Sequence, residues 1–388
     1  MDNTVLDIRE KPAAQQPDWD DHEQIELVRK ELSTRPPLVR ACDIRTLRGH
    51  LAQVAAGTAH IIQSGDCAED PDETTADWVH RKTAVLDLLA GALKMITRGP
   101  VVRVGRIAGQ FAKPRSQPTE TVGGQELPVF RGHMVNAPDP DPAGRRPDPL
   151  RLLTGYMAAS EVTRHLGWDP ACDPSPEPAV WTSHEALLLD YELPMVRRSE
   201  DGELLLTSTH FPWIGERTRQ VEGAHVSLLA EVANPVACKV GPTMTGDELL
   251  ELCGRLDPRR EPGRLTLISR MGARAVSEQL PGLVRTVRAA GHPVIWLCDP
   301  MHGNTVKTAT GHKTRFVESV EREVQAFRYA VAEAGGVAGG LHLETTPDDV
   351  TECTRSVETA HRVPDRYTTF CDPRLNPGQA ISVVSAWQ

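Results

Sequence analysis

The stretch PVIWLCDPMHGNT, residues 293–305, resembles a buried strand that ends in reactive side chains. Its first six residues are almost all apolar, and Asp299, His302 and Asn304 follow directly. Two interpretations are open. The polar residues could cap an Asp-Pro turn by satisfying its backbone groups. Alternatively, the strand could hold functional groups at its carboxyl end, as strands do in barrels and open α/β sheets.

The same pattern recurs along the chain. Short apolar runs bounded by turn residues occupy residues 59–66, 100–107, 179–185, 207–215, 235–241, 264–272, 293–300 and 339–344. Helical periodicity is clearest over residues 75–97, and further helices are expected at 21–32, 43–55 and 149–166. Eight strands alternating with helices predict an α/β fold, a (β/α)8 TIM barrel with an N-terminal helical extension. A doubly wound open sheet is the alternative, but no GxGxxG follows an early strand.

We expect two regions: an arm with helices over residues 1–57, and a catalytic barrel over residues 58–388. A proline-rich excursion over residues 117–178 separates the second and third strands. "GGVAGG" (335–340) is expected to let the eighth strand approach its neighbours closely.

Composition places the chain among soluble globular proteins, with 388 residues, 39% hydrophobic and 25% charged. No apolar run is long enough to span a bilayer, and the charged start lacks a signal-peptide core. Eight single cysteines without a CxxC pair indicate a reduced, cytoplasmic protein. The net charge of −10 argues against nucleic-acid binding. Residues 88–119 nevertheless contain lysines and arginines but no Asp or Glu. This local positive charge predicts either a site for a small anion or a solvated basic face.

Two sets of polar residues gather at the expected carboxyl ends of the strands. The first mixes sulfur, nitrogen and oxygen donors, which suits a divalent transition metal: Cys67, His302, Glu344 and Asp372. Taken alone, Cys67 could equally be a small buried hydrophobe. The second set is cationic and matches phosphate or carboxylate oxygens: Arg106, Lys113, Arg115, Arg217, Lys239 and Arg270. Together they imply small, multiply anionic substrates with a carbonyl to polarise.

Long blocks of the sequence resemble, in order, those of class II 3-deoxy-D-arabino-heptulosonate 7-phosphate (DAHP) synthases. The resemblance runs from about Arg40 to the end of the chain, through "QSGDCAE", "RIAGQFAKPRS", "SHEALLLDYE", "WIGERTRQVEGAHV", "CKVGP", "ISRMGA", "VIWLCDPMHGNT", "GGLHLETTPDDVTEC" and "CDPRLN". It implies a metal-dependent barrel that condenses phosphoenolpyruvate with erythrose 4-phosphate, the first step of the shikimate pathway.

The resemblance also implies roles for individual residues. Cys67, His302, Glu344 and Asp372 would hold the metal, with Mn²⁺ or Co²⁺ placed first and Fe²⁺ or Zn²⁺ as alternatives. The pocket for phosphoenolpyruvate would comprise Arg106, Glu216, Arg217, Lys239 and Arg270, and the aldose phosphate would lie on Lys113, Arg115 and Ser116. Cys67, Lys239 and His302 are the catalytic candidates, and Glu216 or another carboxylate would deliver water. On this interpretation the strand at 293–298 is followed by His302 because its imidazole is a ligand.

Three functions are weighed. The enzyme could make DAHP for primary metabolism or for a secondary pathway such as that to phenazines, use an amino-substituted tetrose phosphate instead, or be an inactive regulatory paralogue. We expect a homodimer or higher homo-oligomer with no nucleic-acid or membrane partner. Oxidation is expected to join Cys67 to Cys371. Long members of the family that respond to aromatic amino acids carry a helical insert before the block matching "SHEALLLDYE". A short, proline-rich linker stands there instead, "GWDPACDPSPEPAV", so we expect no feedback inhibition.

Overall fold

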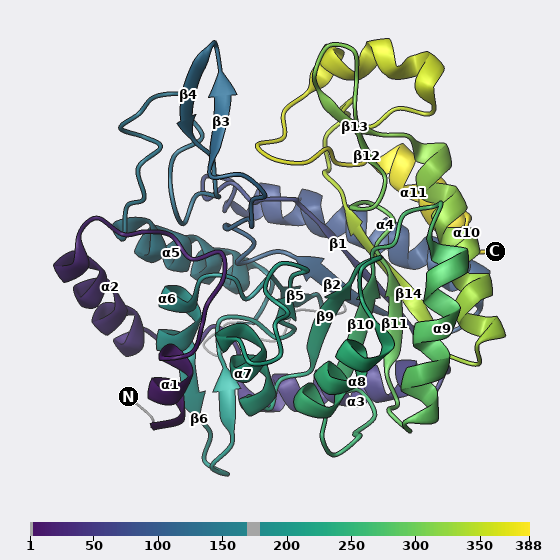
Figure 1. Ribbon diagram of the computed structural model, residues 1–388, viewed down its shortest axis with the longest axis horizontal. Coiled ribbons are helices and arrows are strands. Elements are labelled where there is room, and N and C mark those ends of the chain that lie inside the picture. The colour runs from purple at the N-terminus through teal and green to yellow at the C-terminus, as the bar shows by residue number, and fades with distance from the viewer. Residues whose placement is uncertain (1–2, 169–178) are drawn as a thin grey trace. The chain divides into compact units, whose positions relative to one another are not determined.

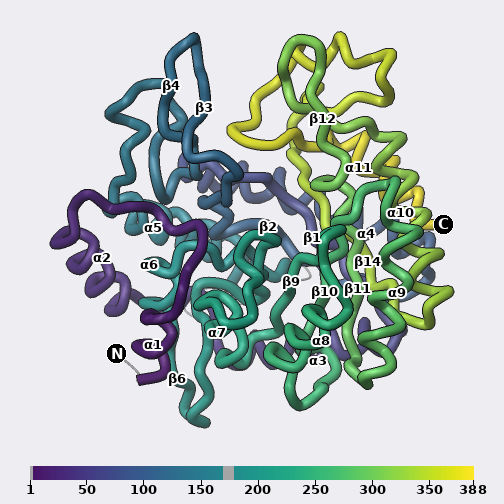
Figure 2. The backbone as a smooth tube through the Cα atoms, in the orientation of Figure 1, coloured from purple at the N-terminus to yellow at the C-terminus, as the bar shows by residue number. Residues whose placement is uncertain are grey.

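The computed structural model describes residues 3–168 and 179–388 of the chain. Contacts divide the chain into two compact units, each described by itself below. The first unit comprises residues 1–44, 68–79 and 107–234, and the second comprises residues 45–67, 80–106 and 235–388. Figure 1 shows the elements and Figure 2 traces the path of the chain.

Eight strands form the main sheet, in the order β5-β2-β1-β14-β11-β10-β9-β8. In chain order this is 3-2-1-8-7-6-5-4, the sequence of neighbours in a (β/α)8 barrel. A parallel bridge between Glu185, just after β5, and Trp213 of β8 links the two end strands. The bounds are β1 His60–Gly65, β2 Val101–Arg106, β5 Trp181–Ser183, β8 Trp213–Ile214, β9 Val236–Val240, β10 Leu265–Ser269, β11 Ile295–Cys298 and β14 Ala338–Glu344.

The second unit holds six of these strands, and the pairs β1–β2, β1–β14, β9–β10, β10–β11 and β11–β14 are parallel. Strands β9, β10 and β11 are buried along their whole length, which explains why their sequences, VACKV, LTLIS and IWLC, are mostly apolar. Strand β14 lies between β1 and β11. A Cβ on Gly340, whose φ is +147°, would lie only 1.8 Å from the Ile61 oxygen, so the expected close approach is confirmed.

Helices cover the outside of this part of the barrel. Figure 1 shows α9 and α10 beside β11 and β14, and α10 contacts both strands. Helix α8 starts at a capping box in which Thr245 and Glu248 exchange side-chain and backbone hydrogen bonds. The remaining bounds in or entering this unit are α3 Ala41–Ala55, α4 Ala76–Thr97, α8 Gly246–Leu256, α9 Val276–Ala289, β12 Thr305–Lys307, β13 Lys313–Arg315, α10 Val317–Glu333, η2 Val357–Arg366 and α11 Pro377–Ser385.

The first unit carries the N-terminal arm and the excursion after β2. Helix α1 packs on α7, and α2 packs on α5 and α6, so the arm contacts later helices of the same chain. A Gly123-Gly124 turn joins β3 to β4 in an antiparallel hairpin. The bounds are α1 Asn3–Arg9, α2 His22–Thr34, β3 Thr119–Val122, β4 Gln125–Pro128, α5 Leu150–His165, α6 Leu189–Glu192, η1 Leu193–Met195, β6 Val196–Arg198, β7 Leu204–Leu206 and α7 Ala224–Glu231.

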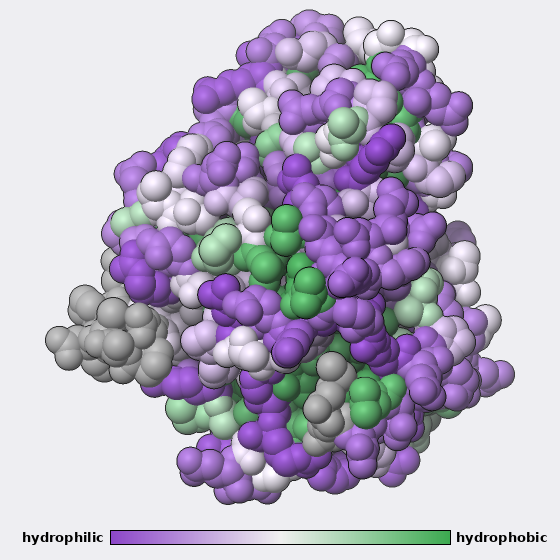
Figure 3. Space-filling view, turned by 90° about the vertical axis from the view of Figure 1, so that its left-hand side faces the viewer, coloured by the Kyte–Doolittle hydropathy of each residue, from purple (hydrophilic) through white to green (hydrophobic). Residues whose placement is uncertain are grey.

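The predicted fold class is confirmed. All eight predicted strands and the four named helices exist, and the N-terminal helical extension is present. Most ends differ by at most three residues, but the strand predicted at 207–215 is only Trp213–Ile214. The predicted domain boundary at residue 57 stays a prediction. On the face drawn in Figure 3, hydrophilic side chains dominate and hydrophobic ones gather in small patches. Among the described residues, no helix combines the length and apolar character that a membrane crossing requires.

Candidate active site

The four predicted metal ligands converge in the second unit. Cys67 follows β1, His302 follows β11, Glu344 ends β14, and Asp372 lies in the loop before α11. Donor atoms of Cys67, Glu344 and Asp372 lie within 4.8 Å of one another, with 3.8 Å between Cys67 Sγ and Asp372 Oδ2. His302 Nε2 is 3.3 Å from Glu344 Oε1. One thiol and two carboxylates therefore meet, with one imidazole beside Glu344, and donors of these types fit a divalent transition metal.

Asp299 fixes the orientation of His302. Its carboxylate is fully buried, lies 2.8 Å from His302 Nδ1, and accepts the backbone N–H groups of Met301 and His302 at 3.1 and 3.3 Å. With Nδ1–H donating to Asp299, the lone pair of Nε2 is left to face the other ligands. Asp299 thus caps the turn, as the structural interpretation expects, and it also orients His302.

Asn304, singled out in the same stretch, has a structural role. Its amide donates to the Pro300 oxygen at 2.8 Å and to Glu323 Oε2 at 2.6 Å. Its oxygen accepts the N–H of Ala273 at 3.2 Å. Asn304 therefore ties the turn after β11 to α10 and to the loop after β10.

Two cations missed at the sequence level neutralise the ligand carboxylates. Arg315, fully buried, donates from Nη1 to Glu344 Oε2 at 2.8 Å and to the Pro373 oxygen. Lys313 Nζ is 2.7 Å from Asp372 Oδ1. Both stand on β13, and Figures 1 and 2 show the β12–β13 hairpin beside the segment that leads to α11. The alternation in "KTR" places both side chains on one face, which is the signal that could have identified them.

The cations of the second unit lie at neighbouring strand ends. Lys239 stands in β9 and forms an ion pair with Asp299. Burial lowers the pKa of Lys239 to about 8, although Asp299 acts to raise it. Burial would raise the pKa of Asp299, but His302 and Lys239 hold it well below its usual value. Arg270 follows β10 directly, and its N–H donates to the Val240 oxygen at 2.9 Å.

Arg106 lies against the ligands. Its Nη2 is 3.1 Å from Glu344 Oε1 and 3.4 Å from the Cys67 oxygen, and its Nε donates to the Asp66 oxygen at 3.0 Å. Its Nη1 lies 2.6 Å from His342 Nε2. Arg106, a predicted substrate-binding residue, therefore pairs with Glu344, a predicted metal ligand. The spacing of the two residues in the sequence does not reveal this contact.

Arg374 links two ligand-bearing loops. Its guanidinium donates to Asp66 Oδ1 and to Glu352 Oε1, both at 2.8 Å. Asp66 is the neighbour of Cys67 in the chain. Lys82 Nζ completes the pairing of Asp66 at 3.0 Å. Arg374 lies two positions after Asp372, so this network holds the loop after β1 to the loop before α11.

The other predicted substrate residues belong to the first unit. Lys113, Arg115 and Ser116 follow β2, and Glu216 and Arg217 follow β8. Arg217 Nη2 donates to Ser116 Oγ, so two of the five residues meet directly. Arg115 Nη2 lies 3.4 Å from Glu120 Oε2, and Glu216 Oε1 accepts from Arg219 at 3.1 Å. Arg115 is also held through its backbone, whose N–H donates to Gln15 Oε1 of the arm at 2.8 Å.

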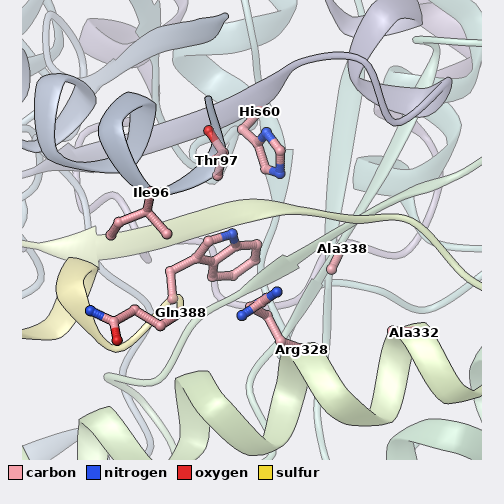
Figure 4. Close-up of a pocket in the computed structure, with 8 residues that line it drawn as sticks. His60, Ile96, Thr97, Arg328, Ala332, Ala338 and Gln388 are labelled. Carbon is pink, nitrogen blue, oxygen red and sulfur yellow. The ribbon is translucent and has the colours of Figure 1, made fainter. Parts of the chain in front are cut away.

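Figure 4 shows a cavity of about 610 Å³ that contains none of the predicted site residues. It includes the first residues of β1 and β14, whereas the ligands lie at the carboxyl ends of the strands. Its lining comprises His60, Ile96, Thr97, Arg328, Ala332, Ala338, Trp387 and Gln388. This cavity and the predicted site therefore lie at opposite ends of the strands.

Comparison with known proteins gives a consistent assignment. The family model described as "Class-II DAHP synthetase family" matches residues 3–168 and 162–386. The chain belongs to the class II DAHP synthase family. A relative from Pseudomonas fluorescens, "Probable phospho-2-dehydro-3-deoxyheptonate aldolase", is 56% identical, and the match covers 100% of this chain and 98% of that one. The predicted family and activity are confirmed: this enzyme condenses phosphoenolpyruvate with erythrose 4-phosphate to DAHP and phosphate.

More distant relatives differ from this DAHP synthase in length. A "Phospho-2-dehydro-3-deoxyheptonate aldolase" from Streptomyces coelicolor is 42% identical over 427 aligned positions, covering 97% of this chain and 94% of that one. The alignment has more positions than this chain has residues, so that relative carries segments that this chain lacks. The solved structure of phospho-2-dehydro-3-deoxyheptonate aldolase from Francisella tularensis matches with a TM-score of 0.53 at 13% identity, covering 98% and 99% of the two chains, and supports the fold alone.

Proposed function

We propose that the condensation depends on a divalent transition metal held by Cys67, His302, Glu344 and Asp372. The observation that carries this proposal is that the donor atoms of Cys67, Glu344 and Asp372 lie close together, with His302 Nε2 beside Glu344. When bound, the metal supplies a Lewis acid for the aldehyde carbonyl of the sugar phosphate. Mn²⁺ or Co²⁺ is our first choice, and Fe²⁺ or Zn²⁺ also suits the mixed donor set.

The chain's own residues prepare the two anionic substrates. We assign the anionic groups of phosphoenolpyruvate to Arg106, Lys239, Arg270 and Arg217, and the aldose phosphate to Lys113, Arg115 and Ser116. Glu216, the neighbour of Arg217 in the chain, is our candidate for delivering water. Arginine forks fit phosphate and carboxylate in two-point contacts, and lysine adds a point charge. Holding both substrates in attacking geometry can contribute about 7–11 kcal/mol of barrier reduction.

Metal removal and reconstitution test this function. Purified enzyme would be stripped with a chelator and reloaded separately with Mn²⁺, Co²⁺, Fe²⁺ or Zn²⁺. We expect phosphate release and a product of DAHP mass in reloaded samples only. Full turnover by stripped protein would refute the metal assignment. An amino-substituted tetrose phosphate, added as a competitor, measures which acceptor the enzyme prefers.

We further propose a cytoplasmic homo-oligomer that serves a secondary pathway. The eight single cysteines support a reduced compartment. Exposed apolar side chains, including Met95 and Tyr329, supply surface that association would bury. Light scattering coupled to size exclusion measures the assembly, and a monomeric mass at micromolar concentration would contradict it.

A further inference from the structure

Three buried side chains from three neighbouring strands form a chain of hydrogen bonds inside the barrel. Gln63 of β1 stands in register with His342 of β14, and Arg106 ends β2. His342 Nδ1 is 2.7 Å from Gln63 Oε1, and His342 Nε2 is 2.6 Å from Arg106 Nη1. Their exposed fractions are 0%, 0% and 2% for Gln63, His342 and Arg106.

Donor chemistry sets the direction of both bonds. A guanidinium can only donate, so His342 Nε2 must accept from Arg106. The ring proton then resides on Nδ1, and Gln63 must present its amide oxygen to it. If the His342 ring were protonated, its Nε2–H would face an N–H of Arg106, and neither could accept. His342 is therefore a neutral acceptor whose tautomer is set by Arg106, and Gln63 accepts the ring proton on the other nitrogen.

We propose that His342 and Gln63 are positioning residues that fix Arg106 for phosphoenolpyruvate binding. The guanidinium is held at Nη2 by Glu344 and at Nε by the Asp66 oxygen, and His342 fixes Nη1. A carboxylate in place of His342 would add a second negative charge beside Arg106. A neutral imidazole orients the cation and leaves its charge available to the substrate. The inference rests on the proposed role of Arg106.

The test compares two substitutions of His342. His342→Leu removes the acceptor, and we expect the KM for phosphoenolpyruvate to rise about tenfold or more, with a smaller change in kcat. His342→Gln supplies an acceptor of similar reach, and we expect the KM to return to within about threefold of the wild type. Metal content should stay unchanged in both, which separates this effect from damage at Glu344. Thr266→Val, a buried change in β10, is the matched control and should leave KM unchanged.

A double-mutant cycle with Arg106→Met separates the possible failures. If His342 acts through Arg106, His342→Leu adds nothing to the KM of the Arg106→Met enzyme. An Arg106→Met enzyme with normal KM would refute the proposed role of Arg106 itself. If the KM is raised in Arg106→Met but normal in His342→Leu, only the positioning role of His342 is overturned. That role is also overturned if His342→Gln has the same raised KM as His342→Leu. If His342→Leu does not fold, Gln63→Leu takes its place, with a raised KM expected and a normal KM overturning the proposal.

Discussion

At the scale of single residues, His302 has one ring nitrogen on Asp299 and the other beside Glu344. We expect His302→Ala to lose turnover and most of its metal while the barrel remains folded, because the side chain is partly exposed and lies in a loop after β11. Metal content by mass spectrometry and far-UV circular dichroism measure the two effects. His361→Ala, an exposed histidine in η2, is the control. An unchanged metal stoichiometry in His302→Ala would remove His302 from the ligand set.

Lys239 gives the active site a pH limit. Burial lowers its pKa to about 8, and only the protonated amine attracts an anion. The kcat/KM for phosphoenolpyruvate should therefore be constant below that pKa and decline as pH rises through about 8. Lys239→Arg keeps its charge, so its decline should move to higher pH. A decline at the same pH in both enzymes would assign the titration to another group.

The thiols are a third residue-scale feature. Cys67 and Cys371 are both buried and both reduced in the structure, so the predicted disulfide stays a prediction. Peptide mapping of oxidised enzyme tests it. Two free thiols in inactivated protein would exclude the disulfide as the cause of inactivation.

At the scale of elements, the β12–β13 hairpin supplies Arg315 to the interior. Removing one partner of a buried ion pair costs about 3–5 kcal/mol. Arg106 also pairs with Glu344, so the carboxylate keeps one cation when Arg315 is removed. We therefore expect the lower end of this range: Arg315→Met should lower the free energy of unfolding by about 3 kcal/mol in metal-free protein. Urea unfolding measures this loss. Lys307→Met, an exposed change on the same hairpin, should cost less than about 0.5 kcal/mol, and equal losses would place the effect in the hairpin rather than the ion pair.

Arg374 connects the loop after β1 to the loop before α11. Partners that orient metal ligands typically contribute about 10–100-fold to metal affinity. Arg374→Lys retains the charge but loses the fork on Asp66 and Glu352, so we expect metal affinity to fall about tenfold. Competition with a chromogenic chelator measures the affinity. Arg366→Lys, an exposed change in η2, is the matched control, and an affinity of Arg374→Lys equal to that of this control would contradict the role.

These elements also show what could be predicted from the sequence. The barrel strands were predictable because burial makes most of them short, mainly apolar runs bounded by turn residues. The β3–β4 and β12–β13 hairpins are short, and their strands lack such runs, although Gly123-Gly124 is a turn signal that could have found the first. The four candidate metal ligands could be proposed from their place at the expected strand ends, and the family resemblance implies the same role for them. The residues that support them were missed, because Arg315–Glu344 and Arg374–Asp66 join positions far apart in the chain.

At the scale of the whole molecule, the length of the chain bears on regulation. Helix α5 ends at His165 and β5 begins at Trp181, and residues 169–178 of the connecting linker lie outside the described residues. The longer Streptomyces coelicolor relative carries segments that this chain lacks. An effector changes activity only through different contacts with two states, so an enzyme without the effector site has no coupling. We therefore expect no inhibition by phenylalanine, tyrosine or tryptophan, which would suit a secondary pathway that runs while aromatic amino acids are plentiful. Initial rates with each amino acid at millimolar concentration, singly and in pairs, measure this, and strong inhibition by any of them would place an effector site elsewhere, for example in the arm.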